Sequence, residues 1–206
     1  MNFKGGMMKI YKLVLVIKSE AILGSGISNV YIHEDCLYDE RGFVYYHSKT
    51  LKGVLHNIAE KLGISEENRN LFFGNEKREG SLIFSNLEIP AEIKKIVKDE
   101  KLLESDILNL QTNIRQFIKI GESGVTESGS LRNIRTIKDG IVLIGEIKSE
   151  KELTAEQERD LLFILKAVRN IGMMKNRGRG EVEFKIYNGS KNLAEVYGGI
   201  EYDKMV

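Results

Sequence analysis

The sequence predicts an α+β fold in which an antiparallel sheet carries two helices on one face. Strand-like apolar runs lie near both ends of the chain, and two amphipathic helical patterns lie between them. These segments also follow a repeated order, in which strand, helix and strand occur twice. At 206 residues the chain suits one domain with elaborations.

The first predicted elements are a buried strand and a hairpin. Residues 9–19, "KIYKLVLVIKS", are rich in Val, Ile, Leu and Tyr, which favours a largely buried strand. Residues 36–47 contain two aromatic-rich runs separated by an acidic-Arg-Gly sequence. We therefore expect a hairpin there, with its turn at residues 39–42.

A helix and a second strand are predicted next. Residues 48–63 carry an i, i+3, i+4 apolar stripe, with Ser48 as the expected N-cap and Gly63 at the stop position. Residues 81–90, "SLIFSNLEIP", predict a strand that ends at Pro90, the only proline.

The middle of the chain predicts an insertion into this core. Residues 91–113 are charged, and their pattern fits either helix or irregular structure. Glycines and serines punctuate residues 114–137 between two β-rich flanks, which indicates a long protruding hairpin. We place the insertion at about 91–135 within a single domain spanning 1–206.

The last third predicts a strand, a helix and a strand. Residues 140–148 form the next core strand. The following helix has a capping box at Thr154 and Gln157, and Gly172 is expected to end it. Residues 181–187 supply the last strand. The complete order matches the ferredoxin-like, or RRM-like, βαββαβ core.

Composition limits the function classes. The 31 Lys+Arg nearly balance the 30 Asp+Glu, so any nucleic-acid site must come from local clustering of cations. Cys36 is the only cysteine, which excludes a disulfide framework within one chain and favours a reducing cytoplasm. The apolar run at residues 13–17 is too short for a signal peptide or a membrane span. We expect a soluble cytoplasmic protein without a membrane partner.

A glycine-rich basic loop is the strongest candidate site. Its glycines and cations are Gly172, Lys175, Arg177, Gly178, Arg179 and Gly180. Successive backbone N–H groups in such a loop form an anion-binding concavity, and the cations neutralise phosphates whatever the base. The loop leads into a strand and lacks the P-loop spacing, which excludes that mononucleotide motif. An ordinary surface connection with solvated cations is the alternative.

Four further cations are candidates for RNA contacts. Lys49 and Lys52 fall on the first turn of the predicted helix 48–63, where free N–H groups also attract anions. Arg132 and Arg135 could stack on bases or bind phosphate. The alternatives are a simply exposed position for Lys52, and salt bridges at a sheet edge or between subunits for the arginines.

Four stretches carry a family resemblance: residues 24–56, 80–90, 114–137 and 172–184. With its "LKG" after a D-x-x-G hairpin and its "ESGSLRNIRTI", the chain resembles the RAMP superfamily of CRISPR-associated proteins. It looks most similar to the backbone subunits of type III effector complexes. The resemblance implies binding of guide RNA (crRNA), complementary target RNA and other RAMP subunits, in antiviral defence. The predicted hairpin would be the thumb that meets the next subunit.

The resemblance also implies a possible target-RNA nuclease. Such subunits often cleave the target with an acidic residue in the loop before the D-x-x-G hairpin. Here His33 occupies the expected position, and Glu34 and Asp35 lie beside it. His33 and Asp35 are therefore the catalytic candidates, and enzymatic activity stays open. We expect no cofactor and no resident metal, with a divalent ion needed only if the target is cleaved.

Two other functions remain open from the sequence. A ferredoxin-like endoribonuclease that processes CRISPR repeat RNA could use a histidine general base, but such enzymes usually carry two tandem domains. A scaffold whose basic loop binds a nucleotide or an acidic protein is the third possibility.

Overall fold

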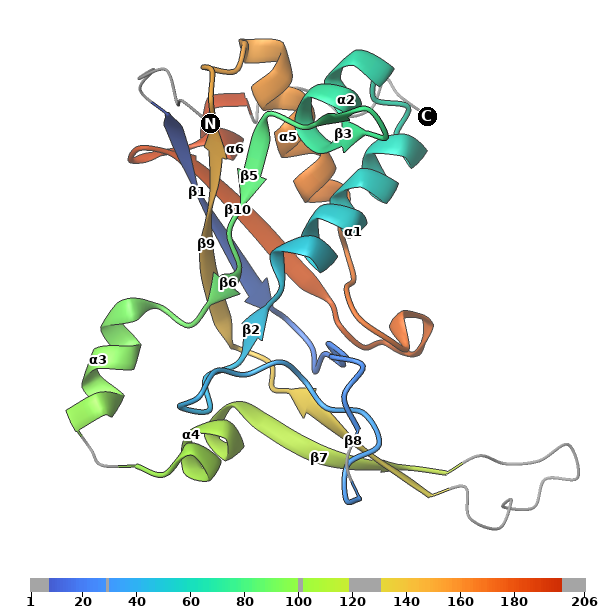
Figure 1. Cartoon of the computed structure of the whole chain (residues 1–206), viewed down its shortest axis with the longest axis vertical. Helices are drawn as coiled ribbons and strands as arrows, with labels where there is room; N and C mark the ends of the chain where they lie inside the picture. The colour runs from blue at the N-terminus through green and yellow to red at the C-terminus, as the bar shows by residue number, and fades with distance from the viewer. Residues whose placement is uncertain (1–7, 29, 100–101, 119–130, 198–206) are drawn as a thin grey trace, which may run out of the picture.

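A computed structural model describes residues 8–28, 30–99, 102–118 and 131–197 (Figure 1). Its centre is an antiparallel sheet with three long strands, β1 (Lys9–Ile17), β9 (Val142–Ser149) and β10 (Val182–Asn188). β1 lies between the other two, and Leu13 is opposite both Ile186 and Gly145. The predicted α+β class with an antiparallel sheet is confirmed.

The complete strand order is β11-β10-β1-β9-β6-β2, and β5 also pairs with β9. The short strands are β2 (Tyr45–Tyr46), β5 (Leu82–Phe84), β6 (Leu87–Glu88) and β11 (Lys191–Asn192). The single strand predicted at 81–90 was wrong, because the ladder breaks at Ser85. The backbone N–H of Glu146 donates to the Ser85 side chain (2.8 Å) in place of a main-chain carbonyl.

Helices cover one face of the sheet (Figure 1). They are α1 (Ser48–Lys61), α2 (Glu66–Phe73) and α5 (Ala155–Ala167), with the short α6 (Leu193–Tyr197) following β11. Alternate strand residues such as Leu13, Leu15 and Leu143 belong to the same fully buried cluster as Leu51 and Leu55 of α1. The predicted apolar stripe of the first helix thus forms the core.

Two predicted helix boundaries were wrong and one capping box is confirmed. His47 rather than Ser48 is the N-cap of α1, because its Nδ1 accepts a hydrogen bond from the Lys49 backbone N–H (3.0 Å). Thr154 and Gln157 form the expected capping box of α5. α5 ends at Ala167, well before Gly172. Its C-cap, Val168, already has an extended backbone.

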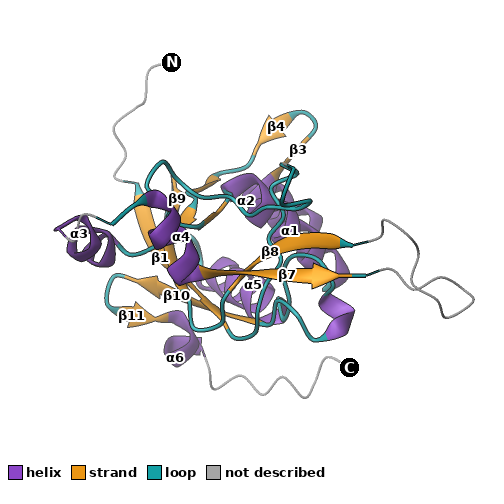
Figure 2. Cartoon of the chain, turned by 90° about the horizontal axis from the view of Figure 1, so that it is seen from below, coloured by secondary structure: helices purple, strands orange, loops and turns teal. Residues whose placement is uncertain are grey.

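A second group of elements, called the second layer here, lies below the lower ends of the sheet strands in Figure 1. It contains α3 (Ala91–Asp99), α4 (Glu104–Gln111) and the antiparallel pair β7 (Thr112–Phe117) and β8 (Arg132–Ile137). The charged stretch 91–113 is therefore mostly helical, and the predicted hairpin is present. Figure 2 shows β7 and β8 extending to one side, with α3 at the opposite side. The tip of the hairpin lies outside the described residues.

Several elements were not predicted. Short strands β3 (Gly74–Asn75) and β4 (Arg78–Glu79) form a small hairpin after α2. The hairpin expected at 36–47 has its turn at Asp39–Gly42, but its arms share only an isolated bridge between Tyr38 and Val44. In the part of the chain that the structure describes, no helix is both long and apolar enough to cross a membrane.

Candidate nucleic-acid interface

The glycine-rich loop and the start of α1 meet at a cavity of about 270 Å³. His47 and Thr50 line it from α1, and Gly172 and Lys175 line it from the loop. Two segments that are more than a hundred residues apart thus form one surface. This arrangement places a loop cation beside the N-terminal end of a helix, where anions are favoured.

The loop contains a single turn of 3-10 helix, Lys175–Arg177, and the residue on each side of it has a left-handed backbone conformation. Met174 before it has φ +57° and Gly178 after it has φ +72°. Lys175 and Arg177 are exposed, and neither forms an ion pair with a described residue. Their charges are therefore available at the surface, as the sequence interpretation requires.

Two of the three loop glycines are explained by packing inside the fold. Gly172 has φ +81° and a Cβ there would overlap the carbonyl oxygen of Ile22. Gly180 has φ +69° and a Cβ there would overlap the carbonyl oxygen of Ile171. At Gly178 a Cβ would meet nothing within 4 Å, so only its positive φ favours glycine. Gly172 and Gly180 therefore need no phosphate to account for them.

Arg179 is held by Glu20, which lies three residues after the end of β1. The Glu20 carboxylate accepts hydrogen bonds from Arg179 (2.8 Å), Arg115 (2.6 Å) and Asn113 (2.6 Å). Hydrogen bonds from Arg115, then from Arg179, lower the pKa of Glu20 from its usual 4.5 to about 2, although burial opposes them. The Arg179 guanidinium also lies 5.3 Å from the centre of the Phe117 ring. Glu20 thereby ties the hairpin to the glycine-rich loop.

Asp35 and Arg135 form a buried ion pair at the base of the hairpin. Arg135 Nε donates to Asp35 Oδ1 at 2.8 Å, and the two side chains are only 10% and 6% exposed. Asp35 also accepts from the Cys36 backbone N–H (2.8 Å), and Arg135 donates to the Thr112 hydroxyl (3.2 Å). Neither charge reaches the surface in this state, which matches the salt-bridge alternative for Arg135.

Residues 33–35 run alongside β8 in the parallel direction, with Glu34 bridged to Ile134. His33 is exposed, and its Nδ1 accepts a hydrogen bond from the Asn133 backbone N–H (3.2 Å). Glu34 is the acidic residue of this segment that lines the cavity with Lys175. The sequence analysis chose Asp35 rather than Glu34 as a catalytic candidate. Successive side chains of an extended segment point to opposite sides, and this alternation was the signal that Glu34 and Asp35 face different surroundings.

Arg132 lies at the outer end of β8. It is exposed and stands directly opposite Phe117 of β7, so the two side chains share one face of the hairpin. Because Phe117 contacts Arg179, this face connects the hairpin with the glycine-rich loop. Arg132 is thus positioned on the side of the hairpin that faces the loop.

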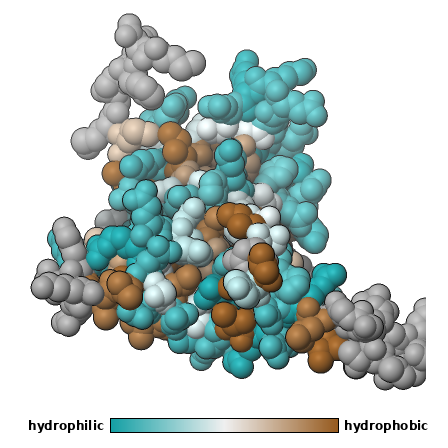
Figure 3. Space-filling model, turned by 60° about the horizontal axis from the view of Figure 1, so that its bottom comes forward, coloured by the Kyte–Doolittle hydropathy of each residue, from teal (hydrophilic) through white to brown (hydrophobic). Residues whose placement is uncertain are grey.

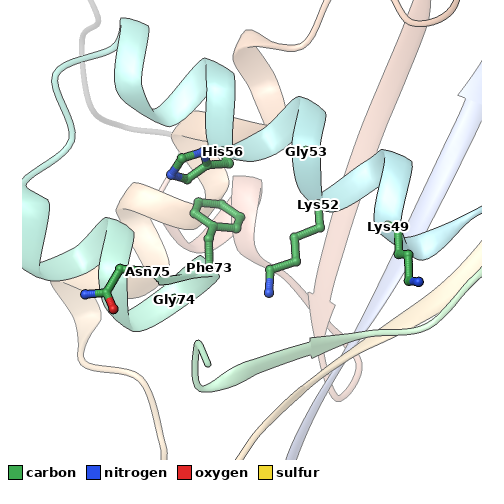
Figure 4. Close-up of a pocket in the computed structure, with 7 residues that line it drawn as sticks. All are labelled: Lys49, Lys52, Gly53, His56, Phe73, Gly74 and Asn75. Carbon is green, nitrogen blue, oxygen red and sulfur yellow. The ribbon is translucent and has the colours of Figure 1, made fainter. Parts of the chain in front are cut away.

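A second groove, of about 400 Å³, lies farther along α1. Lys49, Lys52, Gly53 and His56 line it from α1, and Phe73 lies across from them (Figure 4). Neither lysine forms an ion pair with any residue that the structure describes. The cavity and this groove lie on neighbouring sides of the first turns of α1.

Exposed apolar side chains are concentrated at the end of the molecule formed by the second layer. Figure 3 shows them interspersed with polar groups on that end. Among the described residues the most exposed are Val30 (89%) and Tyr31 (79%) of the neighbouring loop, and Leu103 (68%), Ile96 (67%) and Leu110 (63%). Apolar surface of this kind is typical of contacts with other macromolecules. Among the described residues, no group of three or more His, Cys, Asp or Glu is arranged to hold a metal ion.

Residues 15–183 match the sequence profile of the RAMP superfamily. The chain belongs to this superfamily. The resemblance inferred from the four sequence stretches is therefore confirmed at the level of the family. No curated protein sequence gives a significant match.

Two solved structures show the same fold. One is a chain from a cryo-EM structure of the type III-B Cmr-beta complex bound to cognate target RNA, with a TM-score of 0.66 and 14% identity. The match covers 89% of this chain and 62% of that chain. The other is a chain of the apo Cmr-beta complex, with a TM-score of 0.66 and 12% identity, covering 85% and 96%.

Proposed function

We propose that this RAMP protein is a crRNA-binding subunit of a type III CRISPR effector complex that acts in antiviral defence. Membership of the superfamily and the likeness to Cmr subunits support a component of a CRISPR effector complex. The observation that carries the RNA-binding role is the convergence of the glycine-rich loop and the start of α1 on one cavity. Lys175 lines this cavity and Lys49 lines the adjacent groove of α1, and neither has an acidic partner among the described residues, which suits an extended sugar–phosphate backbone.

The proposed framework is a ferredoxin-like core. Its support is the order β10-β1-β9-β5 in the antiparallel sheet, with α1 between β1 and β5 and α5 between β9 and β10. Two split βαβ units of that fold would have this order, which supports the proposal. The second layer is then the insertion predicted at about 91–135.

Within this proposal the cations have two roles. Lys175, Arg177, Lys49 and Lys52 have no acidic partner among the described residues, and they contact phosphates. Arg179 contacts RNA only in exchange for part of its bond with Glu20, and mainly positions the loop. Arg132 meets the strand on the hairpin face that continues from the loop.

The proposed protein partners are other RAMP subunits of the complex. The exposed apolar side chains of the second layer and of the neighbouring loop support such contacts. Cytoplasmic location stays a prediction from the cysteine content and the function.

Salt-dependent binding tests the RNA-binding role. The double variant Lys175→Ala/Arg177→Ala should weaken binding of single-stranded RNA and reduce the slope of log K against log salt by about 1.4, since each lost phosphate contact on a single strand removes about 0.7. The matched control is Lys12→Ala/Lys191→Ala, which removes two exposed lysines remote from the cavity. Equal binding and equal slopes for both variants would disprove the assignment.

Target cleavage is a second candidate because Glu34 places a carboxylate in the same cavity as Lys175. A complex reconstituted with complementary RNA and a divalent ion provides the test. Regularly spaced cuts that disappear in Glu34→Gln support cleavage at this subunit. Cuts that persist in that variant assign the chemistry elsewhere.

Processing of repeat RNA would need His33 as a general base. Incubating the purified protein with repeat RNA in the absence of metal distinguishes this function. Site-specific cuts that are lost in His33→Ala would replace our proposal with the processing nuclease.

A further inference from the structure

Gly53 has no explanation within the described structure. It lies inside α1 on an exposed face, and a Cβ there would meet nothing within 4 Å. Glycine in a helix interior lowers stability by about 1 kcal/mol relative to alanine. Close approach of another molecule to the helix surface is the remaining structural reason for glycine here.

The surroundings of Gly53 form a defined groove. Lys49, Lys52 and His56 lie on the same side of α1 as Gly53, at the i, i+3 and i+7 spacing that aligns side chains along a helix. Figure 4 shows the Phe73 ring directly beside the His56 ring. Because Gly53 lines this groove, a side chain at this position would fill it.

The groove offers both cations and a flat ring. His56 is exposed, and its ring is packed edge-on against Phe73 with centroids 5.5 Å apart and an interplanar angle of 76°. This contact restrains the imidazole, whose exposed surface borders the groove. RNA-binding proteins stack unpaired bases on side chains of this kind.

Asn75 adds a possible polar contact. Its Oδ1 accepts hydrogen bonds from the backbone N–H groups of Lys77 (2.9 Å) and Arg78 (3.0 Å). This bonding fixes the amide orientation and leaves the Nδ2 group, which bonds no described residue, as a donor at the edge of the groove. A base presents carbonyl oxygens or ring nitrogens that can accept from it.

We propose that this groove holds one unstacked nucleotide of the bound RNA. Its base stacks on His56 and accepts from Asn75 Nδ2, while Lys49 and Lys52 contact the flanking phosphates. The inference rests on the proposed RNA-binding function and extends it beyond the phosphate contacts of the loop. An RNA strand that leaves the cavity at Thr50 reaches the groove by crossing the first turns of α1.

The test uses the full chain and RNAs in which one nucleotide is 2-aminopurine, whose fluorescence reports unstacking from neighbouring bases and stacking on a side chain. Gly53→Gln should fill the groove and weaken binding about tenfold, within the range for one stacked base. His56→Ala should weaken it similarly and alter the fluorescence of one labelled position. Asn57→Gln, an exposed change on α1 outside the groove, is the control and should bind as the parent does.

Three results would overturn the inference, and they have different meanings. If Gly53→Gln and His56→Ala bind RNA like the parent while Lys175→Ala/Arg177→Ala is weakened, the groove is wrong and the RNA-binding function stands. If no variant changes a salt-dependent affinity, the proposed function itself fails. If Gly53→Gln loses only a protein subunit of the complex, the groove is a protein-docking site. Thermal melting of each variant confirms that it is folded.

Discussion

Two regions of the molecule carry the glycines and charges that stand out in the sequence. At the base of the hairpin and in loop 172–180, many of them have partners within the fold: Asp35 binds Arg135, Glu20 binds Arg179, and Gly180 lies against Ile171. On the groove face of α1, Lys49, Lys52 and Gly53 have none among the described residues.

The difference separates residues that build the interface from residues that are free to bind. A charge that is already neutralised inside the protein must break that bond before it contacts a phosphate, whereas a free lysine only loses water and its counterion. Substitutions of the paired charges and close-packed glycines of the first region should therefore lower stability. Substitutions on the groove face should leave stability unchanged or raise it, while weakening RNA binding.

The largest expected effect comes from Asp35. Asp35→Ala leaves the Arg135 guanidinium buried without its counter-charge, which should reduce the free energy of unfolding by about 3–5 kcal/mol. Urea denaturation measures it, with Glu40→Ala as an exposed acidic control. A loss below about 1 kcal/mol would show that Asp35 is not held in a structural pair, and would restore it as a catalytic candidate.

A smaller reduction in the free energy of unfolding is expected from substitution of Gly180. Gly180→Ala must place a Cβ against a main-chain oxygen in a left-handed conformation, at a cost of about 3 kcal/mol. Gly178→Ala adopts a similar φ in open space and should cost only about 1 kcal/mol. Equal losses in the two variants would mean that packing does not distinguish these glycines.

The sequence predicted the framework because apolar periodicity reflects burial. The stripe of α1, the alternation in β1 and the capping box of α5 all follow from local patterns. The interruption of the strand at Ser85 does not follow from a local pattern. The Ser85 hydroxyl accepts a hydrogen bond from Glu146, which belongs to a strand far away in the sequence. Local propensity carries no information on that contact.

The candidate site was predictable in its location but not in the role of each residue. The loop composition singled out Lys175 and Arg177 as RNA-binding cations; both are exposed, and their role stays a prediction. It could not show that Arg135 and Arg179 are paired, because their partners lie 100 and 159 residues away. Gly53 served in the sequence only as part of the "LKG" family marker, because the space around a glycine in a helical pattern is known only from its neighbours in the fold.

From the hydrogen bonds of Glu20 with Arg115 and Arg179 we predict that the protein loses stability in acid. Since the pKa of Glu20 is lowered to about 2 in the folded protein, its contribution is complete above its usual 4.5 and is lost as pH falls towards 2. Arg115 is half exposed, so solvent screening reduces this contribution. Glu20→Gln should remove that part of the pH dependence, as followed by urea midpoints between pH 5 and pH 3.

Glu152→Gln is the control for this measurement, because Glu152 pairs with Lys9 at an exposed site and should change the pH profile little. If Glu20→Gln and the parent lose stability in parallel over this range, Glu20 does not hold the hairpin and loop together.

Gly53→Ala should give the smallest change, and one of opposite sign. Alanine raises helix propensity without meeting any neighbour within 4 Å, so the free energy of unfolding should rise by about 1 kcal/mol. Thermal and urea unfolding measure this, while RNA titration shows whether the single methyl group already hinders the base. A variant that is more stable and binds RNA less tightly would show that Gly53 serves the ligand, because improved folding cannot itself weaken binding. A destabilised variant would instead place Gly53 with Gly180, among the glycines that the fold requires.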